Sequence, residues 1–545
     1  MKDIWLANTN LLSDDKAVTG AIVTLEDGKY YKIGNYDQIP DFFVALVSDS
    51  DLWMYISSNG SLTAGRKDRN MAIFPYYTED KIHDYRGKTG SKTSCLVFRE
   101  GRTSLWEPFA AGHDRIYRLE RNLYKSIYGN SMIFEEKNLD LGVTFRYGWY
   151  SSEKYGWIKK SKIEAHRGAK LKIRILDGIC NILPYGADYA FQNEYSNLLT
   201  AYRKNELLPY SKLALYMLSS IPVDTAEPSE ALKATVVWSA GTVDDSDFLI
   251  SERQIEEFRK GGIPETETDL FAEKGAYYSV GEYDLEGEGH ATWYYVADVN
   301  KDTADVNNLD RFLRSDINLV QKLEEEIAAG TANLVRMVAA ADGLQHSGDE
   351  LMNARHFTNT LYNIMRGGIF EENYNIHTGD FRHYVSQCNL PVSEKHAGLL
   401  DRLPDVIARE QLMGLLKGEG DPDLVRIGFE YLPLTFSRRH GDPSRPWNQF
   451  QIEPKLSDGS RKKGYQGNWR DIFQNWEALC LSFPGYIEPV IARFVNASTA
   501  DGYNPYRISR EGIDWERPNP DDPWAYIGYW GDHQLIYLQK FLEQS

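Results

Sequence analysis

The segment from Gly464 to Glu477 brings together residue types that bind sugars. A glycine-containing turn leads directly into a predicted helix, whose start holds Trp469, Arg470 and Asp471, and Gln474 follows one turn later. An aromatic ring can stack on the apolar face of a sugar, and guanidinium, carboxylate and amide groups can bind its hydroxyls in pairs. These four residues are therefore candidate substrate-binding residues. A carboxylate in the first turn is also favoured by the helix dipole alone, so plain capping is the alternative.

A second cluster of polar residues spans positions 437 to 449. It contains three arginines, one histidine, one aspartate and one tryptophan. Arginine forks bind hydroxyls, carboxylates or phosphate through two hydrogen bonds at once. We take Arg438, Arg439 and Trp447 as further candidate substrate-binding residues, with a solvated surface loop as the alternative.

Carboxylates and tryptophans alternate in a third cluster near the end of the chain. Asp514 and Glu516 flank Trp515, and Asp532 follows Trp530 closely. Cleavage of a glycosidic bond needs an acid that protonates the leaving oxygen, and an inverting enzyme leaves room for a nucleophile on the opposite face of the sugar. Asp514, Glu516 and Asp532 are therefore candidate catalytic residues, and Trp530 is a candidate for substrate binding. Their spacing does not decide which two would face each other.

Composition excludes several other functions. The 545 residues include 61 basic and 79 acidic side chains, giving a net charge of −18, which argues against a nucleic-acid partner. The histidines lack the spacing of a metal site, so we expect no metal. The sequence has no phosphate-binding loop that ends in Lys-Ser or Lys-Thr and no Gly-x-Ser-x-Gly motif. We therefore expect no cofactor.

The sequence also lacks signals for secretion or membrane insertion. No continuous apolar run follows the first residues, and no apolar stretch approaches the length of a membrane span. The four cysteines show no metal or redox spacing, which indicates buried reduced thiols. We expect a cytoplasmic protein with no membrane partner.

Residues 20 to about 300 are predicted to be rich in β-strands. Asn59-Gly60, between two apolar runs, is a strong hairpin signal. Further runs alternate with a period of two and predict short strands of a sandwich: 143–147, 171–175, 234–238 and 292–296. Residues 197–219 are instead predicted to be helical, and residues 244–273 to form a polar surface excursion. Glu135 and Glu136 are expected to be structural.

From about residue 308 the apolar period becomes helical. An amphipathic helix is predicted over 308–328, continuing to about 341, and we assign 305–346 as a helical linker. Further helices are predicted at 348–367, 395–403, 404–417, 421–432, 469–483, 485–496 and 530–543. The long intervening loops, 373–393, 434–468 and 498–529, are of a length that is usually functional. This layout predicts a helical scaffold with a site built from loops at one end.

Several motifs, in order along the chain, resemble cellobiose phosphorylases and their relatives in glycoside hydrolase family 94. Ser57–Arg66 resembles the Ser-Asn-Gly-Gly hairpin region of that family, and Thr103–Phe109 resembles its Trp-Ser-Pro strand. Gly467–Asn475 resembles the family's Gly-Phe-Arg-Asp-Ser-Asn-Gln-Asp helix start, where the aspartate holds hydroxyls of the sugar in the −1 subsite. The resemblance carries that role to Asp471. The chain is also similar, over nearly its full length, to uncharacterised bacterial proteins related to cellobiose phosphorylase.

This resemblance implies a multidomain β and α architecture. Residues 1–304 would form an N-terminal β super-sandwich of the galactose-mutarotase-like kind, residues 305–346 a helical linker, and residues 347–545 a partial (α/α)6 barrel. The implied activity is inverting phosphorolysis of β-linked gluco-oligosaccharides, with inorganic phosphate as co-substrate. The alternatives are a β-glucan hydrolase or transglycosylase, a non-catalytic carbohydrate-binding protein, and a structural module without a ligand.

Two features depart from the family. Tyr465 stands where the family has a sugar-binding arginine, and the chain contains no Trp-Asn-Asp motif for the general acid. About seven helices are predicted after residue 346, fewer than the twelve that the resemblance implies for a full barrel. We therefore expect the chain to be the N-terminal portion of an enzyme, with a C-terminal half-chain or a second copy as partner.

Overall fold

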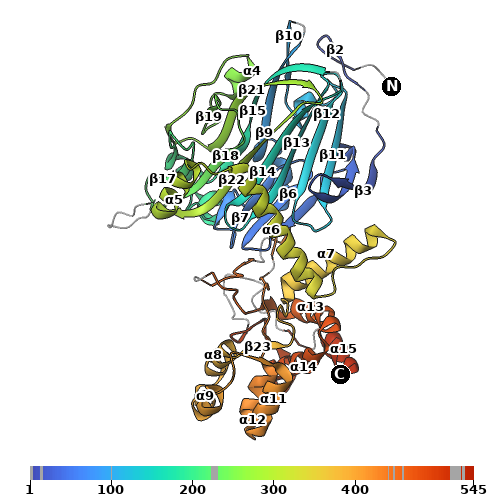
Figure 1. Ribbon diagram of the computed structural model, residues 1–545, viewed down its shortest axis with the longest axis vertical. Coiled ribbons are helices and arrows are strands. Elements are labelled where there is room, and N and C mark those ends of the chain that lie inside the picture. Colours follow the sequence, from blue (N-terminus) through green and yellow to red (C-terminus); the bar gives the residue numbers. More distant parts are fainter. Residues whose placement is uncertain are drawn as a thin grey trace. The chain divides into compact units, whose positions relative to one another are not determined.

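A computed structural model describes residues 4–12, 16–99, 101–167, 169–221, 231–439, 441–445, 449–456, 459–515, 529–530 and 534–545. The chain forms two compact units. Unit 1 contains residues 1–333 together with 441–449, and unit 2 contains 334–440 and 450–545. The protein is therefore multidomain, with a large β-sheet content in unit 1 and mostly helices in unit 2 (Figure 1).

Antiparallel sheets make up most of unit 1 (Figure 1). The eleven-stranded sheet has the order β20 (Asp269–Phe271), β16 (Arg203–Leu207), β17 (Ala214–Leu218), β18 (Lys233–Ala240), β22 (His290–Asp302), β14 (Gly156–Ala165), β13 (Val143–Ser152), β12 (Met132–Asn138), β11 (Leu119–Ser126), β4 (Gly28–Gly34) and β3 (Thr19–Leu25). A five-stranded sheet has the order β10 (Arg102–Trp106), β9 (Gly90–Arg99), β15 (Ala169–Ile182), β21 (Gly275–Gly287) and β19 (Asp247–Leu249). Smaller sheets contain β5 (Phe43–Val47), β6 (Leu52–Ser57), β7 (Leu62–Arg66) and β8 (Ala72–Phe74), and β1 (Trp5–Leu6) with β2 (Thr9–Asn10).

One hydrophobic core joins the large sheets of unit 1. Alternate residues of each strand, such as Phe145, Tyr147 and Trp149 in β13, are buried in it together with side chains from β6 and β15. This is the period of two that the sequence showed, because successive side chains of a strand point to opposite faces. The β-rich first half and the Asn59-Gly60 hairpin are thus confirmed, with Ile56 of β6 paired to Leu62 of β7.

Two helices pack on the outer face of the eleven-stranded sheet (Figure 1). They are α5 (Thr303–Leu313) and α6 (Leu319–Ala340). The prediction of a single helix over 308–328 is wrong, because α5 ends at Leu313 and a new helix begins at Leu319. Asn318 accepts a hydrogen bond from the Gln321 amide at 3.0 Å, which caps a new helix start. The boundary between the two units falls inside α6.

Residues 197–219 are mostly strand, so the predicted helix is wrong. Only α3 (Ser196–Ala201) is helical there, and β16 and β17 follow it. Arg203, Asn205 and Leu207 are buried at alternate positions of β16, so the period of two decides the structure. The remaining short helices of unit 1 are α1 (Glu79–Asp84), α2 (Tyr189–Glu194), and the 3-10 turns η1 (Tyr36–Gln38) and η2 (Ala111–His113).

Residues 244–273 are not merely a surface excursion. They form β19, α4 (Ile255–Arg259) and β20. Ile255 and Phe258 of α4 are buried in a second core against the five-stranded sheet. Their charged neighbours, Glu256 and Glu257, are exposed. The high charge of this segment reflects the outer side of a short amphipathic helix.

Glu135 and Glu136 are structural, as expected from the sequence. They lie on opposite faces of β12 and are almost fully buried. Glu136 accepts hydrogen bonds from Trp106 Nε1 at 2.7 Å and Arg121 Nε at 2.7 Å. Asn122 Nδ2 donates to Glu135 at 2.7 Å. Each buried carboxylate is therefore satisfied by donors of unit 1.

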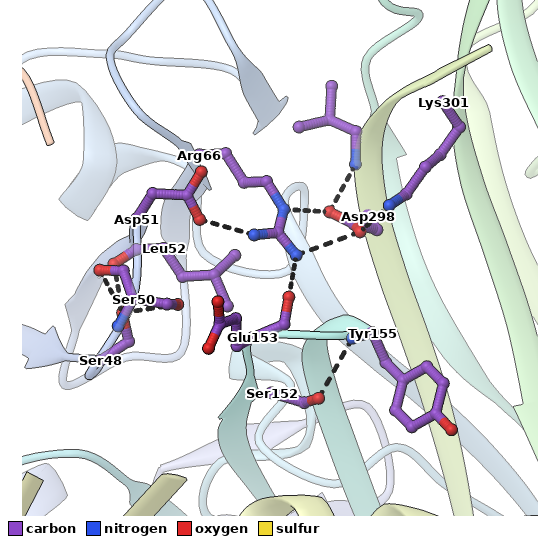
Figure 2. Close-up of polar contacts among 11 residues, drawn as sticks. Ser48, Ser50, Asp51, Leu52, Arg66, Ser152, Glu153, Tyr155, Asp298 and Lys301 are labelled. Atoms are coloured by element: carbon purple, nitrogen blue, oxygen red, sulfur yellow. Dashed lines mark hydrogen bonds and ion pairs between the residues drawn. The ribbon is translucent and has the colours of Figure 1, made fainter. Parts of the chain in front are cut away.

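Arg66, at the end of β7, joins three parts of unit 1 (Figure 2). Its guanidinium donates to Asp298 Oδ1 at 2.6 Å, to Asp51 Oδ1 at 2.6 Å and to the carbonyl of Glu153 at 2.8 Å. Lys301 Nζ approaches the other Asp298 oxygen at 2.7 Å. Burial alone would lower the pKa of Arg66, but the two carboxylates outweigh it and keep the arginine charged. Arg66 therefore holds the hairpin of unit 1 in place.

Unit 2 is built mainly of helices. They are α7 (Glu350–Gly367), α8 (Thr378–Cys388), α9 (Leu390–Lys395), α10 (Ala397–Leu400), α11 (Arg409–Gly418), α12 (Pro422–Glu430), α13 (Trp469–Ser482), α14 (Ile487–Ala497) and α15 (Leu535–Gln544), with the 3-10 turn η3 (Pro484–Tyr486). Short strands connect some of them: β23 (Asn375–His377), β24 (Val406–Ala408), β25 (Gln466–Asn468), β26 (Tyr503–Asn504), β27 (Arg507–Ser509), β28 (Ile513–Asp514) and β29 (Tyr529–Trp530).

The predicted loop 373–393 is wrong, since most of it is the helix α8. Phe381, Tyr384 and Val385 are buried at helical spacing in a core shared with α11 and α12. Polar residues between them obscured this short period in the sequence. The described part of unit 2 therefore contains more helices than the seven predicted after residue 346.

Lys159 is a fully buried cation in unit 1. It is 0% exposed, and its ammonium donates to Asp177 Oδ1 at 2.6 Å and to the Gly178 carbonyl at 2.9 Å. Asp177 also accepts from Thr93 at 2.6 Å and from Trp293 Nε1 at 2.8 Å. Burial lowers the pKa of Lys159, and the Asp177 carboxylate opposes that shift. The charge pair thus depends on both partners being present.

We expect Asp177→Ala to lower the free energy of unfolding of unit 1 by about 3–5 kcal/mol, because it leaves a buried ammonium without its counter-ion. Denaturant unfolding followed by tryptophan fluorescence measures this change. Glu286→Gln is the matched control, since Glu286 forms an exposed pair with Lys170 in the same sheet and should leave stability unchanged. Equal effects of the two substitutions would contradict the role of the buried pair.

Candidate functional site

A three-stranded sheet joins the first and third sequence clusters in unit 2. Its order is β25-β27-β28. Asn468 of β25 pairs with Arg507 of β27, and Arg507 pairs in turn with Asp514 of β28. The Trp469 amide donates to the Tyr506 carbonyl at 3.0 Å, so the start of α13 is fixed to the same sheet. The sheet therefore brings the start of α13, which contains Asp471, close to the strands β27 and β28, the second of which contains Asp514.

The helix α13 is amphipathic, and this decides which candidate residues are accessible. Trp469, Phe473 and Trp476 lie on its buried side. The ring of Trp469 is 0% exposed and packs 4.6 Å from Phe473 and 4.7 Å from Phe494. The prediction that Trp469 stacks against a sugar is therefore corrected, because the residue is fully buried among aromatic side chains of the core.

Three other candidates of α13 are accessible. Arg470 and Gln474 are exposed one turn apart, and Asp471 is half-buried in the first turn. Residues four apart share a face of a helix, so Arg470 and Gln474 can act together on one ligand. A carboxylate in the first turn also complements the positive end of the helix dipole. Asp471 therefore lies, half-buried, at the positive end of α13.

Asp514 is an exposed partner of Arg507. Arg507 Nε donates to Asp514 Oδ2 at 2.8 Å, and a second guanidinium nitrogen contacts the same oxygen. A carboxylate bound in this way fixes the guanidinium beside it. The stacked rings of Tyr503 and Trp515 lie 5.6 Å apart in the same segment. Glu516, Asp532 and the side chain of Trp530 lie outside the described residues.

The residues of the cluster 437–449 are divided between the two units. Residues 441–449 belong to unit 1, where the Tyr55 hydroxyl donates to the Gly441 carbonyl at 2.7 Å. Arg438 is largely buried in unit 2, with its guanidinium 4.9 Å from the ring centroid of Phe436, so it is packed against protein. Arg439 is half-buried in unit 2. Trp447 lies outside the described residues.

Several buried polar atoms at the start of α13 have no hydrogen-bond partner within the described part of the chain. They are the hydroxyl of Tyr465, Oδ1 of Asn468 and Nε1 of Trp469. Buried polar groups are rarely left in this state without a ligand, water or further protein. Tyr465, which replaces the arginine expected from the family, packs edge-on against Trp476 at 5.1 Å.

Two buried arginines fix β27 to the helices. Arg493 of α14 donates to Glu430 Oε2 at 3.0 Å and to the Ser509 carbonyl at 2.7 Å. Arg510 donates to Asp380 Oδ1 at 2.9 Å and to the Lys463 carbonyl at 2.7 Å. Nearby carboxylates and phenols raise the pKa of Arg493 above its ordinary value although burial opposes this, so it remains charged.

Sequence reasoning did not single out Arg507, Arg493 or Arg510. A weak signal existed, because the apolar Ile508 stands between the polar residues Arg507 and Ser509, as in a short strand. Their partners, Asp380 and Glu430, lie about 60–130 residues earlier in the chain. Sequence spacing alone does not give such long-range pairs.

The arrangement is suited to binding a polar ligand. It offers a half-buried carboxylate, exposed guanidinium and amide groups, and orphaned buried polar atoms. No cluster of three or more metal-ligating side chains occurs among the described residues. Within the same residues, no helix is both long and apolar enough to cross a bilayer.

Residues 370–433 match the family model of insertion domain 1 of glycoside hydrolase family 149. No curated protein sequence matches the chain. The matched segment runs from just after α7 to just after α12, so it covers α8 to α12 and includes both Asp380 and Glu430. The chain thus carries a segment that is similar to an insertion domain of a glycoside hydrolase family.

Solved structures show distant likenesses. The chain is similar to a bacterial glucoamylase complexed with acarbose, with 10% identity, a TM-score of 0.36 and coverage of 97% of this chain and 68% of the other. A human-microbiome protein assigned as a kojibiose phosphorylase shares 9% identity with a TM-score of 0.28, covering 63% of this chain and 36% of its own length. The family 92 α-mannosidase of Bacteroides thetaiotaomicron shares 9% identity with a TM-score of 0.23, covering 45% and 28%.

The chain spans only about a third of the length of the phosphorylase and of the mannosidase. All three TM-scores lie below 0.5, so these likenesses support no argument about the site.

We expect Arg493→Met to lower the free energy of unfolding of unit 2 by about 3 kcal/mol, because it leaves Glu430 buried without its main counter-ion. Amide exchange at Ile508 and Ser509 should become faster, since β27 loses an anchor. Arg426→Met is the matched control, because Arg426 pairs with the same Glu430 but is 51% exposed, and should cost less than about 1 kcal/mol. A loss from Arg426→Met as large as that from Arg493→Met would contradict this account.

Proposed function

We propose that this protein is part of a carbohydrate-active enzyme that acts on β-linked gluco-oligosaccharides by inverting phosphorolysis. The family 149 match carries the carbohydrate part of the proposal. Asp380 and Glu430 of the matched segment are ion-paired to Arg510 and Arg493, which hold the sheet of the candidate site. The matched segment and the site therefore form one connected polar structure within unit 2.

In this proposal Asp471 holds sugar hydroxyls, with Arg470 and Gln474 as further contacts. Inorganic phosphate is the co-substrate, and no other cofactor takes part. Glu516 and Asp532 are the candidates for the general acid, while Asp514 anchors Arg507. Unit 1 would correspond to the β super-sandwich of phosphorylases and unit 2 to part of an (α/α)6 barrel.

The same residues are compatible with hydrolysis or transglycosylation of a β-glucan. These two reactions and phosphorolysis all require the sugar to be bound before the glycosidic bond is cleaved. Phosphate-dependent release of glucose 1-phosphate separates phosphorolysis from both. A non-catalytic carbohydrate-binding protein is the candidate from a different class. Sugar binding without turnover, also in the presence of a C-terminal half-chain, would favour it.

The proposed partners are a C-terminal half-chain or a second copy, and the proposed location is the cytoplasm. Exposed apolar side chains on α13, α14 and α15, such as Leu481, Val495 and Ile536, support a partner for unit 2. Size-exclusion chromatography with light scattering, with and without the half-chain, tests this part of the proposal.

We expect Asp471→Asn to weaken binding of a β-gluco-oligosaccharide at least about tenfold, because a charged acceptor of hydroxyl groups becomes neutral. Isothermal titration measures the affinity. Glu488→Gln is the matched control, since Glu488 is an exposed carboxylate in the first turn of α14 and should leave binding unchanged. Unchanged affinity in Asp471→Asn, with a folded protein, would contradict the assigned role.

A further inference from the structure

A cavity of about 310 Å³ lies in unit 2, at the root of the segment 370–433 that matches the family 149 model. The two ends of that segment are joined there, because the amides of Ile369 and Thr435 each donate to the carbonyl of the other at 3.0 Å. Residues of three chain segments, 370–377, 433–435 and 460–463, line the cavity. Its volume falls in the range of about 300–1,000 Å³ that is typical of ligand pockets.

Packing and backbone hydrogen bonds hold one wall of this cavity in place. The ring of Phe370 is stacked on Tyr486 with 3.7 Å between the ring centroids. The Tyr486 hydroxyl donates to the Asn373 carbonyl at 3.2 Å, and Asn375 of β23 pairs with Ala408 of β24. A wall that is ordered in this way loses little conformational entropy when a ligand binds.

Glu371 offers a fixed acceptor to the cavity. Its carboxylate accepts from the Thr435 hydroxyl at 2.9 Å and from Arg336 at 3.2 Å, and Arg461 Nε lies 3.4 Å from it. The side chain is only 11% exposed, so these donors compensate its buried charge. The orientation of this carboxylate is therefore set by protein contacts.

Lys463 and Glu372 line the same cavity without being paired to each other. Lys463 is half-buried, and Glu372 is exposed. Among the described residues, neither the ammonium nor the carboxylate forms a hydrogen bond or an ion pair. Burial lowers the pKa of Lys463, although the charges of Asp380, Glu372 and Glu371 oppose that shift. A ligand that supplies an acceptor to this ammonium therefore replaces hydration that burial has removed.

The lining carries charges of both signs, which decides the class of ligand. Two carboxylates, Glu371 and Glu372, oppose an anion, and two cations, Arg461 and Lys463, oppose a metal ion. A hydroxyl group both donates and accepts, so a neutral ligand with several hydroxyls matches the donors and the acceptors together. The amide of Asn375 adds a further donor and acceptor at the same cavity.

We propose that this cavity is a second saccharide-binding subsite, in which Lys463, Glu372 and Asn375 bind hydroxyl groups of one unit of an oligosaccharide. The subsite rests on the proposed function, because the other end of the same sugar chain would lie at the start of α13. Lys463 precedes Asn468 by five residues, which span at most about 18 Å when fully extended. One oligosaccharide of several units can therefore reach both places, and the preferred substrate is longer than a disaccharide.

Calorimetric titration of the full chain with a β-linked gluco-hexasaccharide and with the corresponding disaccharide tests the subsite. We expect the hexasaccharide to bind more tightly than the disaccharide, and Lys463→Gln to weaken hexasaccharide binding at least about tenfold. The disaccharide, which the start of α13 binds, should keep its affinity in this variant. Equal hexasaccharide affinity in the wild type and in a folded Lys463→Gln would overturn the proposal.

Lys462→Gln is the matched control, because Lys462 is the neighbouring residue but pairs with Glu453 at 3.0 Å and does not line the cavity. It should bind both sugars as the wild type does, and a loss equal to that of Lys463→Gln would overturn the assignment.

Glu372→Gln guards against a simple folding defect, since this side chain is exposed and the substitution keeps its shape. We expect the variant to melt at the wild-type temperature and to bind the hexasaccharide at least about threefold more weakly. Unchanged hexasaccharide affinity would overturn the role of Glu372.

The same titrations separate a failure of the subsite from a failure of the proposed function. If neither sugar binds to the wild type, both are overturned. If Asp471→Asn weakens binding of both sugars while Lys463→Gln weakens neither, only the subsite is overturned. If Lys463→Gln weakens hexasaccharide binding while Asp471→Asn weakens neither sugar, the subsite stands and the role of Asp471 is overturned.

Discussion

The candidate site depends on the buried ion pair between Glu430 and Arg493. Both residues are less than a tenth exposed, and Arg493 also donates to the carbonyl of Ser509 in β27. A buried charge without its partner is costly, so this pair can exist only when α12, α14 and β27 are all in place. Arg507 and its neighbours are therefore positioned by a contact that lies behind the site.

Two buried cations of unit 1 are paired in the same way. Arg66 has two carboxylates and a carbonyl as partners, and Lys159 has Asp177 and Gly178. Each of these cations is hydrogen-bonded to acceptors of its own unit.

The sequence could predict features that depend on local periodicity. The strands of unit 1, the hairpin at Asn59-Gly60 and the helix α13 all follow from alternation or helical spacing. The same logic failed where polar residues hid a short period, as in α8 and β16. It also failed for Trp469, because residue type suggested a binding surface whereas the helical face directs the ring inward. The structural roles of Arg493 and Arg510 could not be predicted from the sequence, because their ion-pair partners, Glu430 and Asp380, are distant in the chain.

The central claim is that sugars bind where β25, the start of α13 and β27 meet. Hydrogen exchange of the full chain with and without a β-gluco-oligosaccharide tests it most directly, because it reports the bound region without assuming a reaction. The account predicts protection of residues 466–471 and 507–514 in the presence of the sugar. Saturating sugar that protects other segments, with no change in these two, would contradict it.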